Sequence, residues 1–232
     1  MLHGRSRYAV TFWRNEMSVL INDPAATIKI GGAEKQLSGV AAEFMPVLYI
    51  HDAINYMRPE RVLYEAIPNG DMLYINYYVH WQDEIAPIKL WHFIYSQIRK
   101  VRYGSVNDIE FVEVGITLAT GRVDHIAFEW DPACKPDNFA PLHYIVVATR
   151  NGDSDSFNVT IRDKSAPAEK IPFFGKRPSV LVPVWNHIYD FYRGKGVMMD
   201  DPPLEPMTDA LYEEYWMGKR SRPPSRIKFV TK

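Results

Sequence analysis

The feature that most constrains the fold is an alternating run between positions 108 and 118. Asp108 and Glu110 are followed at every second position by an aliphatic side chain. Side chains two residues apart share one face of a β-strand, so the two carboxylates begin an apolar row that faces a core. An earlier run over residues 73–81 has the same alternation and leads to Asp83. Ionised carboxylates are costly to bury without partners, so the two runs predict a polar pocket at the ends of these rows.

Short runs of β-branched and aromatic residues recur along the chain, separated by turn signals such as Pro68-Asn69-Gly70. The sequence has no internal repeat and no regular alternation of strands with helices. It therefore predicts an all-β fold: a single, jelly-roll-like β-sandwich with one inserted helix and short helical pieces near the C-terminus. We expect one domain over residues 1–232, with N-terminal strands or an extension over 1–40, the sandwich core over 41–195, and a Pro-rich, basic tail over 196–232.

The inserted helix is predicted over residues 87–102, where apolar residues recur at helical spacing. Pro87 suits the first turn of a helix, and the basic residues near position 100 suit its C-terminal end. Within this segment, Trp91 and Tyr95 are more typical of core packing than of a platform for a ligand. The same two side chains would also suit packing against a second subunit, so a homo-oligomer is left open.

Composition disfavours several classes of protein. The net charge of the 232-residue chain is −1, which argues against a dedicated nucleic-acid binder. No stretch is long and apolar enough for a membrane span, and residues 1–20 lack the apolar centre of a signal peptide. The single cysteine, Cys134, cannot form an internal disulfide and is interpreted as an ordinary thiol in a reducing compartment. We therefore expect a cytoplasmic protein.

Motifs narrow the chemistry further. The chain lacks a Gly-rich phosphate loop, a dinucleotide fingerprint, a zinc-protease helix motif and a serine nucleophile elbow, so no nucleotide cofactor is expected. Oxygen ligands such as Asp83, Asp108 and Glu110 favour Mg²⁺, Ca²⁺ or Mn²⁺, and an added imidazole favours Mn, Fe or Zn. Two alternatives stay open. The carboxylates could act as an acid and a base, or they could be structural and pair with backbone amides or with Arg58 or Arg61.

The histidines differ as candidates for the pocket. His51 and His143 each lie beside apolar strand residues, which is typical of structural histidines. His80 falls on the strand face opposite Asp83, so we do not expect it beside that carboxylate. His187 suits either role, and we assign it to the pocket as a proton shuttle.

Three segments resemble a group of known β-sandwich proteins. Residues 43–62 (EFMPVLYIHDAINYMRPERV) are similar to the opening pattern of fungal and bacterial vacuolar-protein-sorting-like domains. Residues 73–83, followed by 104–114, resemble the necrosis-inducing cytolysin family, in which an aromatic strand ending in Asp precedes a Gly-His-Arg-His-Asp-Trp-Glu heptapeptide. Residues 177–191 are similar to a late strand and histidine of the same group.

The resemblance implies a single β-sandwich with a divalent-metal site at one edge. Matched residue by residue, Asp83, Asp108 and Glu110 would hold the metal, and His187 would lie near the same pocket. Both histidines and the tryptophan of the heptapeptide are replaced within residues 104–110 of this chain. The resemblance therefore implies the fold more strongly than it implies cytolytic activity.

We consider three functions from different classes. The first is a cytoplasmic enzyme that acts on a small, largely apolar metabolite in a lyase, cyclase or isomerase step. Asp108, Glu110 and His187 would supply acid/base or metal-assisted chemistry in an enclosed apolar cavity at the end of the sandwich. The walls of that cavity would be four aromatic side chains: Tyr78, Trp81, Trp91 and Trp185.

The second function is a metal-dependent binding module for a glycan or a lipid headgroup. Such a module would show an open rim of exposed aromatic side chains around a cation instead of an enclosed cavity. The third is a structural or interaction protein, in which the carboxylates would be fully paired and no cavity would be present. These contrasting expectations allow the structure to discriminate among the three.

Overall fold

The computed structural model describes residues 20–54, 56–83, 89–103, 108–131, 143–162 and 164–217. Strands make up 52% of the structure and helices 18%, so the mainly-β prediction is confirmed. The helices in this part of the chain fall short of the length and apolarity that crossing a bilayer requires. Several predictions concern residues outside the described ones: the N-terminal strands before residue 20, Pro87 as a helix start, Cys134 and the basic end of the tail.

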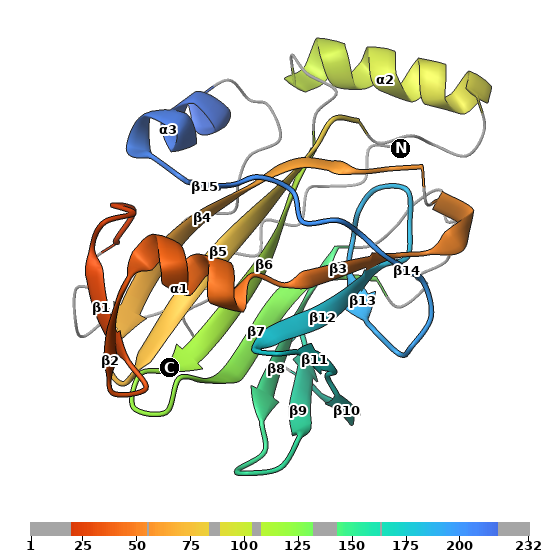
Figure 1. Cartoon of the computed structure of the whole chain (residues 1–232). Coiled ribbons are helices and arrows are strands. Elements are labelled where there is room, and N and C mark those ends of the chain that lie inside the picture. Colours follow the sequence, from red (N-terminus) through yellow and green to blue (C-terminus); the bar gives the residue numbers. More distant parts are fainter. Residues whose placement is uncertain are drawn as a thin grey trace.

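Eight strands form a large sheet, in which β4 to β10 follow one another as an antiparallel meander (Figure 1). Their spatial order is β10, β9, β8, β7, β6, β5, β4 and β15. The bounds are Pro59–Asn69 for β4, Met72–Trp81 for β5, Asp108–Thr117 for β6, Arg122–Trp130 for β7, Tyr144–Arg150 for β8, Ser156–Ile161 for β9, Lys164–Lys170 for β10 and Leu204–Pro206 for β15. Strand β15 pairs in parallel with β4, so part of the predicted tail completes one edge of the sheet.

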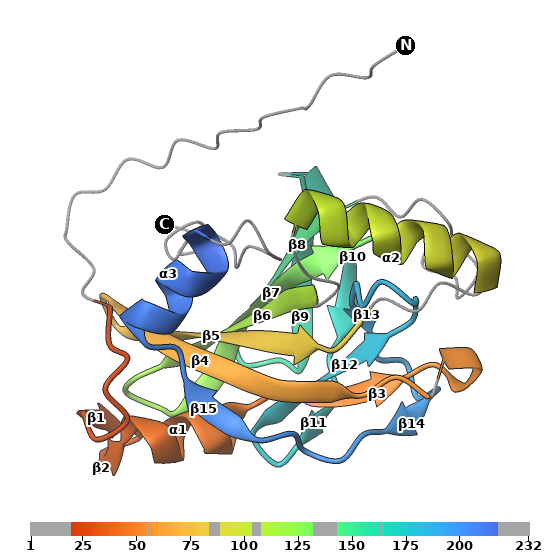
Figure 2. The same ribbon diagram turned by 90° about the horizontal axis from the view of Figure 1, so that it is seen from above.

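A smaller sheet lies against one face of the large sheet (Figure 2). Its order is β11, β12, β3 and β14, and β13 pairs with β12. The bounds are Val47–Ile50 for β3, Phe173–Phe174 for β11, Arg177–Val182 for β12, Asp190–Phe191 for β13 and Val197–Met198 for β14. On the same side lie the hairpin of β1 (Thr27–Ile30) with β2 (Ala33–Gln36) and the helix α1 (Leu37–Phe44). A short 3₁₀ turn, Asp52–Ile54, follows β3.

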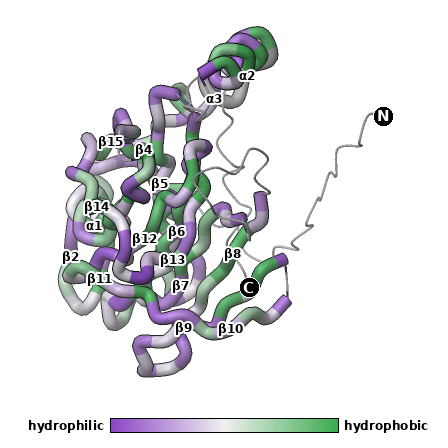
Figure 3. The backbone as a smooth tube through the Cα atoms, turned by 90° about the vertical axis from the view of Figure 1, so that its right-hand side faces the viewer, coloured by the Kyte–Doolittle hydropathy of each residue, from purple (hydrophilic) through white to green (hydrophobic). Residues whose placement is uncertain are grey.

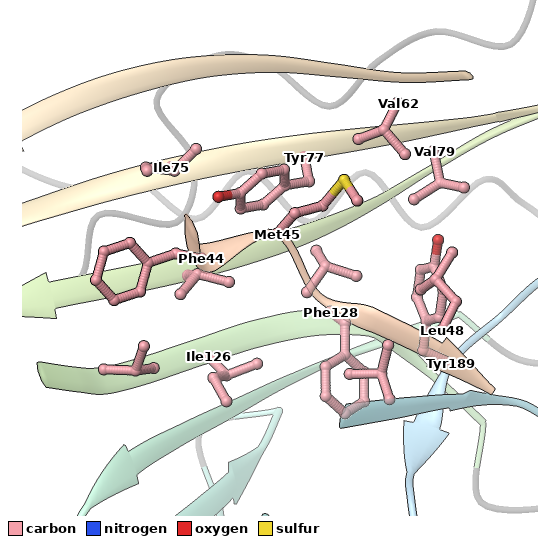
Figure 4. Close-up of a cluster of buried hydrophobic side chains, with 14 of the residues drawn as sticks. Phe44, Met45, Leu48, Val62, Ile75, Tyr77, Val79, Ile126, Phe128 and Tyr189 are labelled. Carbon is pink, nitrogen blue, oxygen red and sulfur yellow. The ribbon is translucent and has the colours of Figure 1, made fainter. Parts of the chain in front are cut away.

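The main core fills the space between the large sheet and these covering elements. The alternate residues of β5 that were predicted to face a core are all buried: Leu73, Ile75, Tyr77, Val79 and Trp81. Figure 4 shows side chains of this row, such as Tyr77 and Val79, beside Met45 and Leu48 of the covering layer. The Tyr77 hydroxyl also donates a hydrogen bond of 2.8 Å to the carbonyl of Ala41, which attaches α1 to the sheet. The inward-facing rows are therefore confirmed.

The opposite face of the large sheet is also buried over strands β4, β5 and β6 and most of β7. A polar row crosses three strands there, because Glu65, Asn76 and Glu113 are neighbours in register and all three are buried. Each carboxylate has one hydrogen-bonding partner on the same face. The Tyr78 hydroxyl donates to Glu65 at 2.5 Å, and His125 Nε2 lies 2.8 Å from Glu113 Oε1. Buried polar groups with such partners are compatible with a stable sheet.

The predicted inserted helix and a predicted helical piece near the C-terminus are present, and α1 is a further helix that was not predicted. Helix α2 spans Lys89–Tyr103, and α3 spans Asp209–Met217. The start of α3 packs with Met207 on the outer face of the large sheet, in one cluster with Leu63 and Tyr78. In Figure 3, α2 stands apart from the body of the sheets and alternates between hydrophobic and hydrophilic residues.

Replacing Gly115 by Ala is expected to destabilise the large sheet. A Cβ at this position would lie 2.8 Å from the Cβ of His125 and 3.0 Å from the Tyr74 ring, which leaves no room for a methyl group. We expect the free energy of unfolding, measured by urea denaturation, to fall by about 1–3 kcal/mol. The control is Gly39→Ala in α1, where a Cβ meets nothing within 4 Å and helix propensity improves by about 0.5–1 kcal/mol. A Gly115→Ala protein as stable as the wild type would contradict this packing.

Candidate functional site

Four strands of the large sheet begin or end side by side next to α2. Strand β5 ends and β6 begins with the paired residues Trp81 and Asp108. Strand β7 ends and β8 begins with the paired residues Trp130 and Tyr144. In Figure 1, α2 lies beyond this end of β5 and β6. We call this region the Asp108 end of the sheet, and it is where the predicted carboxylates lie.

Asp108 is buried between two basic side chains. Arg99 of α2 places Nη2 3.4 Å from one carboxylate oxygen, and His187 places Nδ1 3.1 Å from the other. The side chains of both partners are almost completely removed from solvent. Such contacts offset the cost of removing the carboxylate from water. Asp108 therefore pairs with Arg99 and His187, and not with Arg58 or Arg61 as the structural alternative suggested.

His187 has an unusual backbone conformation. Its φ is 63°, in the left-handed region that residues other than glycine seldom adopt. Its N–H donates to the carbonyl of Val184 at 3.1 Å, and its ring stacks on Trp81 with centroids 4.1 Å apart. A strained conformation costs on the order of 1–3 kcal/mol and persists only where its surroundings hold it. Here the stacking with Trp81 and the contact with Asp108 hold the imidazole in place.

Strands β6 and β7 separate close to this point. Their pairing goes no further than Val112 opposite Phe128, although both strands continue beyond it. The segment around Tyr189 lies beside β7 instead. Its N–H donates to the carbonyl of Glu129 at 3.0 Å, and it forms a parallel bridge with Trp130. The separation lets side chains from the two faces of the sheet approach each other.

Three possible metal ligands converge at this separation: Glu110, Glu129 and His143. One ligand atom from each lies within 4.8 Å of the other two, and His143 Nδ1 lies 2.6 Å from a Glu129 oxygen. The His143 side chain is 53% exposed, so an ion can reach it from solvent. We call these residues the Glu110 triad. Two carboxylates with an imidazole suit a divalent cation such as Mn, Fe or Zn. The described residues contain no second group of this kind.

The pKa of the buried Tyr189 hydroxyl is raised by its surroundings in this region. Burial raises its pKa well above the ordinary value, and the negative charge of Glu110 raises it further. The nearby Trp81 lowers that pKa in part, and the charges of Asp108 and Glu129 add to the increase. Negative charge is therefore concentrated around one buried hydroxyl, which favours the binding of a cation nearby.

The structure assembles only part of the predicted metal site. Of Asp83, Asp108 and Glu110, the triad includes Glu110 alone. Asp83 lies beyond the end of β5, with Oδ2 3.7 Å from Nε2 of His92 on α2. Asp108 is occupied by its contacts with basic side chains. Among the described residues, the expected set of three carboxylates is therefore not brought together as a ligand group.

The four predicted wall residues do not line one cavity either. Trp81 is buried, and Trp185 is buried in edge-on contact with Tyr95 of α2 at 5.4 Å. Trp91 is exposed on α2. Tyr78 points to the opposite face of the sheet. The structure therefore brings Trp81 and Trp185 to the Asp108 end as packing residues, and it places Tyr78 elsewhere.

A small hollow lies between the two sheets instead. It is lined by residues of both layers, among them Met45, Leu48, Tyr77, Val79 and Met199, and it has room for about one water molecule. No carboxylate of the Asp108 end lines it. This hollow is therefore not the enclosed apolar cavity at the carboxylates that the enzyme hypothesis expects.

Two members of the triad were not expected from the sequence. No sequence pattern singles out Glu129 as a ligand, and the apolar neighbours of His143 predict a structural histidine. A usable signal is that both residues flank the loop between β7 and β8, whose first pair is Trp130 with Tyr144. A hairpin brings the residues at its ends together, but its register has to be known before these two can be placed side by side.

No known protein family, curated protein or solved structure gives a significant match to this chain. The resemblance to the necrosis-inducing cytolysins therefore stays a prediction. A function for this protein has to be argued from the geometry of its site.

Replacing Asp108 by Asn is expected to destabilise the protein strongly. The substitution removes the negative charge that faces the buried guanidinium of Arg99, and breaking a buried ion pair typically costs about 3 kcal/mol or more in unfolding free energy. The matched control is Asp153→Asn. Asp153 lies 2.9 Å from Arg122, but its side chain is fully exposed, so stability should not change. Equal denaturation midpoints for the two variants would contradict the structural role of Asp108.

Stability is also expected to depend on pH through His80. This side chain is buried, 2.9 Å from Glu60, and burial lowers the pKa of its imidazole despite the opposing effect of Glu60. In the unfolded state the pKa of the imidazole is near 6.5, so the unfolded state binds the proton more tightly than the folded state. The stabilisation is full above that value and is lost as the pH falls through it towards the folded-state pKa.

We expect His80→Gln to flatten the pH dependence of the unfolding free energy between about pH 7 and pH 5. Chemical denaturation of wild type and variant at each pH would measure the difference. Parallel curves for the two proteins would show that His80 does not titrate in this way.

Proposed function

We propose that the chain is a divalent-cation-dependent binding protein for a glycan or a lipid headgroup, with the cation held by Glu110, Glu129 and His143. The observation that carries this proposal is the convergence of the three ligand atoms within 4.8 Å at an exposed edge. Three protein ligands leave coordination positions open on the ion. Hydroxyl or phosphate oxygens of a ligand would complete the coordination.

The surroundings of the triad support a binding role. Trp130 and Tyr144, which follow Glu129 and His143 in sequence, are opposite each other in register and half-buried. Aromatic faces beside a few fixed polar groups are typical of small-molecule sites. The 53% exposure of the His143 side chain fits an open site.

The proposal also includes the finer architecture. The large sheet and the smaller sheet that covers it would form the two layers of a single β-sandwich. In that arrangement the Glu110 triad lies at one end of the layers, where β6 and β7 separate. Binding sites at the ends of sandwiches are accessible because loops, not strands, surround them.

A second candidate function is the enzyme, and the geometry of His187 favours it. This residue combines a strained φ of 63° with a contact to Asp108, and strained residues cluster at functional sites. Asp108 would orient the imidazole, Glu110 would act as acid or base, and the cation would polarise a small apolar metabolite in a lyase, cyclase or isomerase step. Ligand turnover that His187→Gln abolishes, with cation affinity unchanged, would select this function over simple binding.

The triad is expected to bind a divalent cation stoichiometrically. Titration of the chelator-treated protein with Mn²⁺ or Zn²⁺ in a calorimeter should give one site and raise the melting temperature, because binding to the folded state stabilises it. Glu129→Gln and His143→Ala should each weaken the affinity by about tenfold or more. A glycan array and a headgroup array probed with and without chelator would then test whether the ion is needed for ligand binding.

The matched control is Glu60→Gln. Glu60 and His80 form a carboxylate–imidazole pair of 2.9 Å, similar to that of Glu129 with His143, but they belong to no group of three ligands among the described residues. Cation affinity should therefore be unchanged in this variant. A wild-type protein that binds no ion, or that loses affinity equally in Glu60→Gln and Glu129→Gln, would refute the site.

A further inference from the structure

Helix α2 carries its apolar side chains on the outside. Of the ten large apolar side chains that are exposed among the described residues, six belong to this one helix. They are Leu90, Trp91, Phe93, Ile94, Ile98 and Val101. Exposed apolar residues that occur singly need no explanation, but a contiguous group marks a surface that binds something.

The side of α2 that faces the protein is polar or aromatic instead. Arg99 pairs with Asp108 at 3.4 Å, and Tyr95 packs edge-on against Trp185. With His92 and Ser96, these residues recur every three or four positions, so they form one face of the helix. Figures 1 and 2 show α2 outside the layers of strands. The contacts of Arg99 and Tyr95 therefore hold the apolar stripe away from the body of the protein.

Positive charge borders the apolar stripe. Lys89 and Lys100 are exposed on the same helix, and the sequence from Lys89 to Tyr103 contains neither Asp nor Glu. An apolar stripe with aromatic residues, basic borders and no acidic residue is the pattern of helices that lie in the interface of a bilayer. Basic residues close to an anionic bilayer each contribute about 1 kcal/mol of attraction.

A second copy of the chain fits this surface less well. Two α2 helices packed antiparallel would bring Lys89 of one copy towards Lys100 of the other, with no acidic residue on either helix to compensate. A helix of 15 residues is also only about 22 Å long. One face of that length covers a few hundred Å², well below the roughly 800 Å² per partner of a standard interface.

We propose that α2 is an interfacial helix that binds the surface of an anionic lipid bilayer. Its five outermost apolar side chains would lie among the headgroups: Leu90, Phe93, Ile94, Ile98 and Val101. Lys89 and Lys100 would contact lipid phosphates at the borders of the stripe. Attachment of this kind lies on the membrane and does not cross it. It requires no ion at the Glu110 triad, and it orients the Asp108 end of the sheet towards the lipid.

Co-sedimentation of the full-length protein with vesicles tests the proposal. We expect the wild type to bind vesicles of phosphatidylcholine with about a third phosphatidylserine, and Phe93→Ser to lower the partition coefficient about tenfold, as for the loss of one buried aromatic side chain. The matched control is Phe174→Ser, because Phe174 and Phe93 are both 62% exposed and only Phe93 lies on α2. Circular dichroism would show that both variants stay folded, since neither side chain is buried.

A second pair of variants tests the charge. Lys100→Gln should lower binding to the anionic vesicles about fivefold and leave binding to pure phosphatidylcholine unchanged. Lys170→Gln, at an exposed lysine of β10, should change neither. The anionic binding should also weaken as the salt concentration rises.

Several outcomes would overturn the proposal. One is a wild-type protein that does not sediment with anionic vesicles. Another is equal loss of binding in Phe93→Ser and Phe174→Ser. A wild-type dimer that Phe93→Ser dissociates would assign the stripe to a second copy. Vesicle binding that a chelator abolishes and Phe93→Ser leaves intact would assign it to the Glu110 triad, so the two proposals fail separately.

Discussion

The contact of Asp108 with Arg99 and His187 holds together three parts of the chain that are distant in sequence. Asp108 begins β6, Arg99 belongs to α2, and His187 lies in the turn after β12. A carboxylate at the head of a buried row has to be compensated, because an ion in a low-dielectric interior is otherwise too costly. The placement of α2 and the strained turn at His187 both follow from this requirement. The turn at His187 also brings Tyr189 beside β7, at the point where β6 and β7 are no longer paired.

The separation of β6 and β7 creates the second group of charges. Within a regular ladder, Glu110 would share the inner face with Val112, and Glu129 would share the outer face with Ile145. The two glutamates meet because the ladder ends at Val112 and Phe128. Where two neighbouring strands separate, side chains that would otherwise lie on opposite faces of the sheet can come together. It also leaves the carboxylates close to the buried hydroxyl of Tyr189, where burial raises the pKa of that hydroxyl and the charge of Glu110 raises it further.

Much of the fold could be predicted from alternation alone, since Asp108, Glu110 and the inward row of β5 lie where a period of two places them. The residues that make up the Glu110 triad could not be predicted in this way. Glu129 follows the buried Phe128, so alternation assigns it to the other face, and no local pattern signals that the ladder stops there. The pairing of Asp108 with Arg99 could not be predicted either, because a basic residue near the C-terminal end of a helix is already explained by the helix dipole. In both cases the missing information was a long-range contact, which side-chain periodicity does not carry.

Helix α2 shows how a single buried charge can decide which side of a helix faces inward. Its apolar periodicity predicts a helix correctly, but packing that stripe inward would turn Arg99 away from Asp108. Depriving a buried carboxylate of its partner costs about 3–5 kcal/mol. Exposing an apolar side chain forgoes up to about 1.5–3 kcal/mol, and several are exposed on this helix. The observed orientation therefore satisfies the charge at the expense of the apolar stripe, whose six exposed side chains together forgo more free energy than the unpaired charge would cost. Burial of that stripe against a bilayer would recover the free energy of burying the apolar side chains and would keep the Arg99–Asp108 pair intact.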